Sequence, residues 1–136
     1  MSLTGLHHIR AGQLSDDTAQ SGQMRRLEAI AGKTVGSAAL WMGETHLTPS
    51  ARSADHHHGA TETAIYVVSG HPRFVFVEDG SEVAIDTSPG DYVFVPPWVP
   101  HREENPSPDV EAVVVIARSS QEAVVVNLPS LAPLPR

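Results

Sequence analysis

Cysteine is absent from this sequence, and lysine, aromatic residues and long apolar runs are scarce. Without cysteine, the chain has no disulfide, thiolate zinc site, iron–sulfur cluster or cysteine nucleophile. No apolar run approaches the roughly 20 residues that a membrane span needs. The first ten residues also lack the apolar stretch of a signal peptide. We therefore expect a cytoplasmic protein that does not contact a membrane.

Positive charge is scarce as well. The 136 residues carry 9 basic side chains against 16 acidic ones, for a formal net charge of −7. A nucleic-acid-binding surface needs clustered lysine and arginine, so the composition argues against such a partner. A 40% apolar share with 18% charged residues is typical of a globular chain of one domain. The unusual feature of the composition is its histidine content, with 8 residues.

Short runs rich in valine, isoleucine, phenylalanine and tyrosine fill the chain from residue 38 onward, and turn-forming glycine, proline and aspartate separate them. Such runs, without helices between them, predict an all-β antiparallel sandwich or barrel. We expect strands at 38–47, 64–69, 73–77, 82–85, 92–95, 111–117 and 123–127.

The pattern divides the chain into three parts. Residues 1–35 are expected to form an N-terminal arm, with a possible short helix over 21–33 because Met24, Leu27 and Ala31 share one helical face. Residues 36–127 are the barrel, and 128–136, with three prolines, form an extended tail. The valine runs at 113–116 and 124–126 are apolar on both faces, so they lie either between two sheets or against a second subunit.

The sharpest motif is His56-His57-His58, followed by Glu62. Residues two apart on a strand share a face, so His56 and His58 project together. Two imidazoles and a carboxylate make half of a metal site suited to Fe, Mn, Co, Ni, Cu or Zn. His101, after a proline-rich turn, is the candidate for a third imidazole.

Together these residues resemble the two motifs of the cupin superfamily. The second motif, G-x5-P-x-G-x2-H-x3-N, is met by Gly90, Pro96, His101 and Asn105, with Trp98 in place of the inner glycine. In the first, G-x5-H-x-H-x3-4-E-x6-G, three residues fit and two positions depart. His56, His58 and Gly70 match, whereas Ser50 stands at the first glycine and Thr63 stands six residues before Gly70.

The resemblance implies a double-stranded β-helix, a jelly-roll barrel of the small single-domain kind, with a divalent metal ion (Fe, Zn, Ni or Mn) inside. Its implied ligands are His56, His58, Glu62 and His101. Glu62 is one residue out of register, so either a bulge delivers it to the metal or the protein supplies three histidines alone. Cupins are commonly dimers, so a homodimer is expected, with Val124–Val126 as the shared edge.

Two further residues are candidate catalytic groups. Glu103 lies on the same face of an extended strand as His101, and His46 lies on an earlier strand; either is a possible acid or base. Trp98 is the candidate for a lid at the mouth of the barrel. The negative net charge of the chain disfavours polyanionic substrates.

Open coordination positions distinguish a catalytic metal from a structural one. The resemblance therefore implies a small metalloenzyme that acts on a small organic carbonyl or enol substrate. It would be either a dioxygenase or a Lewis-acid isomerase or polyketide cyclase. The alternative is a non-catalytic protein that binds or senses a small molecule through its metal.

Overall fold

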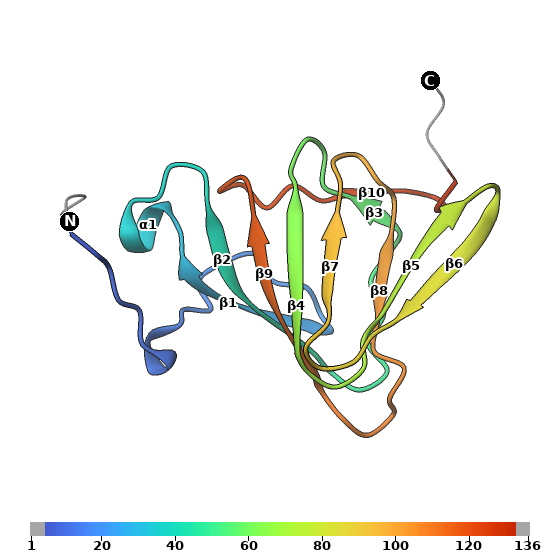
Figure 1. Cartoon of the computed structure of the whole chain (residues 1–136), viewed down its shortest axis with the longest axis horizontal. Coiled ribbons are helices and arrows are strands. Elements are labelled where there is room, and N and C mark those ends of the chain that lie inside the picture. Colours follow the sequence, from blue (N-terminus) through green and yellow to red (C-terminus); the bar gives the residue numbers. More distant parts are fainter. Residues whose placement is uncertain (1–4, 133–136) are drawn as a thin grey trace.

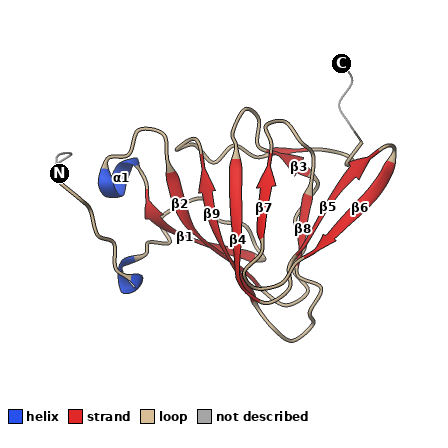
Figure 2. Cartoon of the chain, viewed as in Figure 1, coloured by secondary structure: helices blue, strands red, loops and turns tan. Residues whose placement is uncertain are grey.

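Most regular secondary structure in this chain is β-strand, which follows from its alternating apolar residues. The computed structural model describes residues 5–132, so the expectations for 1–4 and 133–136 lie outside the described residues. In chain order the elements are η1 (Ala11–Gln13), β1 (Met24–Ile30), α1 (Gly32–Val35), β2 (Trp41–Leu47), β3 (His56–His57), β4 (Thr63–Ser69), β5 (Arg73–Glu78), β6 (Ser81–Asp86), β7 (Tyr92–Val95), β8 (Arg102–Glu104), β9 (Ala112–Arg118) and β10 (Val126–Asn127). Strands dominate in Figure 2, and across the described residues no helix is long and apolar enough to cross a membrane.

The strands form an antiparallel jelly roll. One sheet has five strands in the order β1-β2-β9-β4-β7, and smaller sheets have the orders β6-β5-β8 and β10-β3 (Figure 1). An isolated bridge pairs His56 with His101 and so joins the two smaller sheets. This second layer therefore reads β10-β3-β8-β5-β6, and the expected all-β double-stranded β-helix is confirmed.

The core lies between the two layers. Strict alternation along β2 and β4 buries every second residue, which turns Leu47, Ile65 and Val67 inward. From the other layer Phe74 packs into the same apolar cluster, and Val114 of β9 closes it. The run at 113–116 is the middle of β9, with Val114 buried and Val113 half-buried on the outer face.

The helix expected over 21–33 is wrong. Met24–Ile30 forms β1, which pairs with β2, and the helical part is the single turn of α1. Met24 and Leu27 fit a helical spacing, but pairing with β2 satisfies the backbone groups on one side of the segment and the strand conformation buries Met24. A helix of this length has no comparable source of stability alone.

The ends of the barrel also differ from expectation. Of the run at 123–127, the structure makes a strand only of Val126–Asn127, and Val125 and Val126 are 51% and 41% exposed. In the tail, Leu131 is buried, so this part of the chain packs against the barrel.

Candidate metal centre

His56 and His58 reach the barrel interior from β3 and the turn that follows it. They point to one side, whereas His57 between them points away. The His57 ring accepts a hydrogen bond at Nδ1 from the Gly59 amide at 2.9 Å and lies 5.5 Å from the Trp98 ring. Period-two alternation in an extended segment produces this separation.

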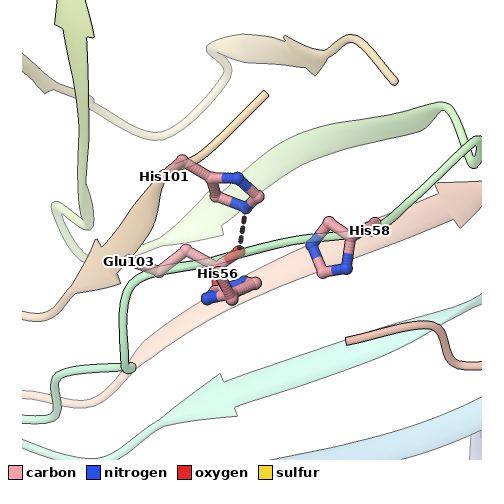
Figure 3. A group of neighbouring side chains, drawn as sticks. All are labelled: His56, His58, His101 and Glu103. Carbon is pink, nitrogen blue, oxygen red and sulfur yellow. Dashed lines mark ion pairs between the residues drawn. The ribbon is translucent and has the colours of Figure 1, made fainter. Parts of the chain in front are cut away.

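His101 reaches the same place through backbone pairing. The His56 amide donates to the His101 carbonyl at 3.0 Å, and the His101 amide donates back at 2.9 Å. Two residues later, on the same face of β8, stands Glu103. Figure 3 shows the side chains of His56, His58, His101 and Glu103 converging from these two segments.

The backbone orients all three imidazoles in the same sense. Nδ1 lies 2.6 Å from the Ala54 carbonyl in His56, 2.8 Å from the Val124 carbonyl in His58, and 3.0 Å from the Val99 carbonyl in His101. A carbonyl only accepts, so each Nδ1 carries the proton and each Nε2 keeps its lone pair free. This is the arrangement that holds histidine ligands on a metal.

The rings are also close enough to share one ion. Their centroids are 4.8 Å apart for His56 and His58, 4.5 Å for His56 and His101, and 5.0 Å for His58 and His101. One ligand atom from each histidine and one from Glu103 lie within 4.8 Å of one another. Nitrogen and oxygen donors in this ratio suit Fe, Mn, Co, Ni, Cu and Zn.

A buried nitrogen without a partner shows that the group fits a metal. Nε2 of His101 is buried and makes no hydrogen bond. Its nearest acid, Oε1 of Glu103, lies 3.5 Å away, which is an ion-pair distance but too long for a good hydrogen bond. A buried polar atom left in this way is unfavourable unless a ligand satisfies it. A cation between the two residues would supply that partner.

Burial and mutual charge set the protonation states. Burial lowers the pKa of His56, and it lowers the pKa of His58 to about 4. Burial also acts to lower the pKa of His101, but the interaction with Glu103 outweighs it and raises that pKa. Burial raises the pKa of the Glu103 carboxyl, yet the histidines outweigh it and bring the pKa down to about 2. At neutral pH the site therefore holds neutral His56 and His58 and an ionised Glu103, the forms that bind metal.

The group faces a cavity of about 450 Å³. This volume lies in the range of small-molecule sites. Apolar side chains make most of its wall, including Met24, Leu47, Ile65, Phe74, Val114 and Ile116. Arginines from β1 and β9 also line it, as does the buried Trp41. A ligand in this space would reach His56, His58 and Glu103, the members of the group that line it.

Glu62, the carboxylate that the first motif implies, is not brought to the histidines. It is exposed just before β4, and its amide donates to Ser119 Oγ at 2.9 Å. Along β4 the odd-numbered residues turn inward, so Thr63 lines the cavity instead. The carboxylate in the group is that of Glu103, which was expected as an acid or base. The signal for it in the sequence is its spacing of two from His101.

His46 lies outside the cavity. Its neighbours Thr45 and Leu47 face the interior, so alternation puts His46 on the outer face of β2. There its ring nitrogens lie 3.0 Å from Glu44 Oε2 and 3.0 Å from Glu111 Oε1. An acid or base at this place would not touch a ligand in the cavity.

Trp98 stands where the second motif has its inner glycine, and its backbone adopts a conformation typical of glycine. Its φ is +66°, in the left-handed region that side chains other than glycine seldom adopt. The side chain is 60% exposed and stacks near His57, not over the cavity, so it does not form the expected lid. Trp41 is the tryptophan that lines the cavity.

Comparison with solved structures supports the fold. The S161A mutant of the oxalate decarboxylase from Bacillus subtilis superposes with a TM-score of 0.67 at 23% identity, over 81% of this chain and 29% of that one. The structure of the same enzyme at pH 4.6 gives a TM-score of 0.67 at 23% identity, over 80% of this chain and 28% of that chain. A further structure describes Mn(II) centres in that decarboxylase, with a TM-score of 0.67, 23% identity, and coverage of 80% and 29%. The present chain thus spans less than a third of those proteins.

No curated protein matches this sequence significantly. The model of the cupin domain, however, matches residues 43–117, which is more than half of the chain. That range contains both motif segments and all four converging side chains. The chain belongs to the cupin family.

Proposed function

We propose that this cupin binds one divalent transition-metal ion, Fe, Zn, Ni or Mn, through His56, His58, His101 and Glu103. The bound ion serves chemistry on a small organic carbonyl or enol substrate in the adjoining cavity. The observation that carries the proposal is the shared orientation of the three imidazoles, with every Nδ1 tied to a backbone carbonyl and Nε2 free.

The site is suited to catalysis rather than to a structural role. A structural zinc site in proteins is closed, commonly with thiolate ligands, and this chain has no cysteine. Four ligands leave positions open on an octahedral ion, and His56, His58 and Glu103 line a cavity rather than lying sealed in the core. A metal ion here would act as a Lewis acid toward a substrate oxygen or, if it is iron, would support dioxygenase chemistry.

The chain's own residues would prepare the substrate. The apolar wall around Leu47, Ile65 and Phe74 would exclude water and hold the apolar part of a ligand. Ionised Glu103 would bind the metal and could not also act as a free base at the same time. A proton acceptor for the Lewis-acid reaction would then come from a water molecule or from the substrate itself.

Metal content tests the proposal. We expect protein purified without a His tag to contain about one metal ion per chain by elemental analysis. H56A, H101A and E103Q should each bind the ion at least about tenfold more weakly. E62Q is the matched control, because Glu62 is exposed and outside the group. Loss of metal from E62Q with full retention by E103Q would assign the carboxylate to Glu62.

Oxygen uptake separates the two reaction types. Iron with substrate-dependent consumption of oxygen favours the dioxygenase, and zinc or nickel without it favours the Lewis-acid enzyme. A bound metal with no turnover of any carbonyl or enediol compound screened would favour the non-catalytic binding protein. A cytoplasmic location stays a prediction.

We also propose a homodimer that shares the edge at β10. Within the described residues β10 pairs only with β3, and Val126 of this strand and the preceding Val125 are substantially exposed. An apolar, unpaired strand edge is a surface that a second chain can cover. Sedimentation should show a dimer at micromolar concentration, and V126K should shift it toward monomer; a monomeric wild type would contradict the assignment.

A further inference from the structure

Three arginines line the cavity: Arg52, and two that strand alternation turns into the barrel, Arg26 and Arg118. On β1 alternation turns Met24, Arg26 and Glu28 inward, and on β9 it turns Arg118 inward at the end of the strand. Both arginines line the cavity that the metal-binding group faces. A guanidinium inside a protein needs compensation for the loss of water, so its partners are informative.

Among the described residues neither arginine has a carboxylate within 4.0 Å, whereas Arg52, Arg73 and Arg102 all form ion pairs. Arg26 donates from Nη1 to Ser21 Oγ at 3.0 Å. Arg118 makes only long hydrogen bonds, 3.4 Å from Nε to the Ser120 carbonyl and 3.3 Å from Nη2 to the Gln121 carbonyl. Since a guanidinium has five donor hydrogens, both keep donors free.

The surroundings of Arg118 hold its guanidinium in place without neutralising it. Its Cζ lies 4.0 Å from the centre of the Trp41 ring, and the Trp41 indole donates to Glu28 Oε1 at 2.7 Å. The other oxygen of Glu28 lies 3.4 Å from Lys33 Nζ, so this carboxylate already serves a different cation. The aromatic face and the indole hydrogen bond fix the position of Arg118 beside the cavity.

The two guanidiniums also act on one another. Burial lowers the pKa of Arg118, and the positive charge of Arg26 lowers it further, against the opposing charge of Glu28. Both guanidiniums line one cavity, and neither has a carboxylate within 4.0 Å in the described part of the chain. The same arrangement attracts an anion, and a carboxylate accepts paired hydrogen bonds from guanidinium with matching geometry.

We propose that Arg26 and Arg118 bind the carboxylate of an organic acid whose apolar body lies along the cavity wall. This inference rests on the proposed function, because the opposite end of such a molecule would reach the metal-binding group. The cavity of about 450 Å³ has room for an aromatic or branched aliphatic body, and its apolar wall favours such a body over a short dicarboxylate. The substrate class is therefore a monocarboxylic acid that carries the reacting carbonyl or enol. A single carboxylate is compatible with an acidic protein, whereas a polyanion is not favoured.

Binding of phenylacetate and of its neutral analogue phenylacetamide tests the inference. Both are titrated into metal-free, chelator-treated protein by calorimetry, so that neither binds through a metal. We expect phenylacetate to bind at least about tenfold more tightly than the amide. R26Q and R118Q should each weaken phenylacetate binding by a similar factor and leave binding of the amide unchanged. R25Q is the matched control, because Arg25 lies on the same strand but is exposed on the outer face.

The outcomes separate this inference from the proposed function. Equal affinity for acid and amide, or unchanged affinity of both R26Q and R118Q, overturns the carboxylate site. If R118Q does not fold because it loses its contact with Trp41, R26Q and the acid–amide comparison in the wild type decide the result. If protein purified without chelator contains no metal, but the wild type still prefers the acid and R26Q loses that preference, only the proposed metal function is contradicted. Protein with metal that shows no preference for the acid contradicts only this inference.

Discussion

Replacing Asn105 with alanine should destabilise the protein more than the loss of one small side chain suggests. The side chain is 2% exposed and lies after β8 at the final position of the second motif. Its Nδ2 donates to the carbonyls of Leu47 at 3.1 Å, Thr48 at 3.2 Å and Val110 at 2.8 Å. Its Oδ1 accepts from the Ser107 amide at 3.2 Å. One amide thus connects the end of β2 with the loop between β8 and β9.

The magnitude follows from these contacts. Each net hydrogen bond is worth about 1 kcal/mol, and buried groups left without a partner add to the loss. Two amide hydrogens serve three carbonyls, and the oxygen serves one amide, so about three bonds are lost. We expect N105A to lower the free energy of unfolding by about 3 kcal/mol. N105D should lose at least as much, because it would turn a carboxylate oxygen toward three carbonyls.

Urea denaturation followed by circular dichroism at pH 7 measures the effect, with the slope of the transition compared between proteins. The matched control is N127A, because Asn127 is exposed on β10 and should change stability by less than about 0.5 kcal/mol. A loss below about 1 kcal/mol for N105A, with an unchanged slope, would refute the view that this amide holds the two segments together.

Two further predictions concern backbone and charge. Gly70 directly follows β4 and has φ of +77°, and a Cβ there would lie 2.8 Å from the backbone of Ala112. Gly80 has a similar φ of +79°, but a Cβ there would meet open space. We expect G80A to lose about 1 kcal/mol from backbone strain and G70A to lose about 1–3 kcal/mol more by urea denaturation; equal losses would exclude the steric effect. Burial lowers the pKa of His46, but hydrogen bonds and charge from Glu111 and Glu44 raise it above its usual value of 6.5. The raised pKa stabilises the fold below pH 6.5, and this stabilisation is lost as the pH rises through the pKa of the folded state. We therefore expect the free energy of unfolding of E111Q to be up to about 1 kcal/mol below that of wild type at pH 6. At pH 9 the two proteins should be equally stable. A His46 titration by NMR that is unchanged in E111Q would contradict this account.

Local alternation explains why most of the barrel could be predicted. The strands at β2, β4, β5, β6, β7 and β9 carry branched or aromatic residues between turn residues, and both features act over a few residues. β1 was missed because Met24, Leu27 and Ala31 also fit a helix, and only pairing with β2 decides between the two periods. β3 and β8 are absent from the expected strands because two and three residues are too few to show a period, and only the histidine spacing indicated extended backbone there.

The same distinction applies to the metal centre. His56, His58 and His101 could be selected from spacing alone, because alternation and the motif place them without knowledge of the rest. The carboxylate ligand could not be selected from spacing, because Glu62 and Glu103 both lie near a histidine in the sequence. The backbone bridge between His56 and His101 puts β8, and therefore Glu103, beside the group, while the register of β4 turns Thr63 inward and leaves Glu62 in solvent.

By itself the sequence determined the all-β class, the donor set of nitrogen and oxygen without sulfur, and the three histidines. The class and the donor set depend on composition and local alternation, the pair His56 and His58 on a period of two, and His101 on its place in the second motif. The tertiary structure decided which carboxylate joins them, that β1 closes the edge of the sheet, and that Arg26 and Arg118 share a cavity. These outcomes depend on which strands pair and in what register, and that pairing is settled by contacts between residues far apart in the chain.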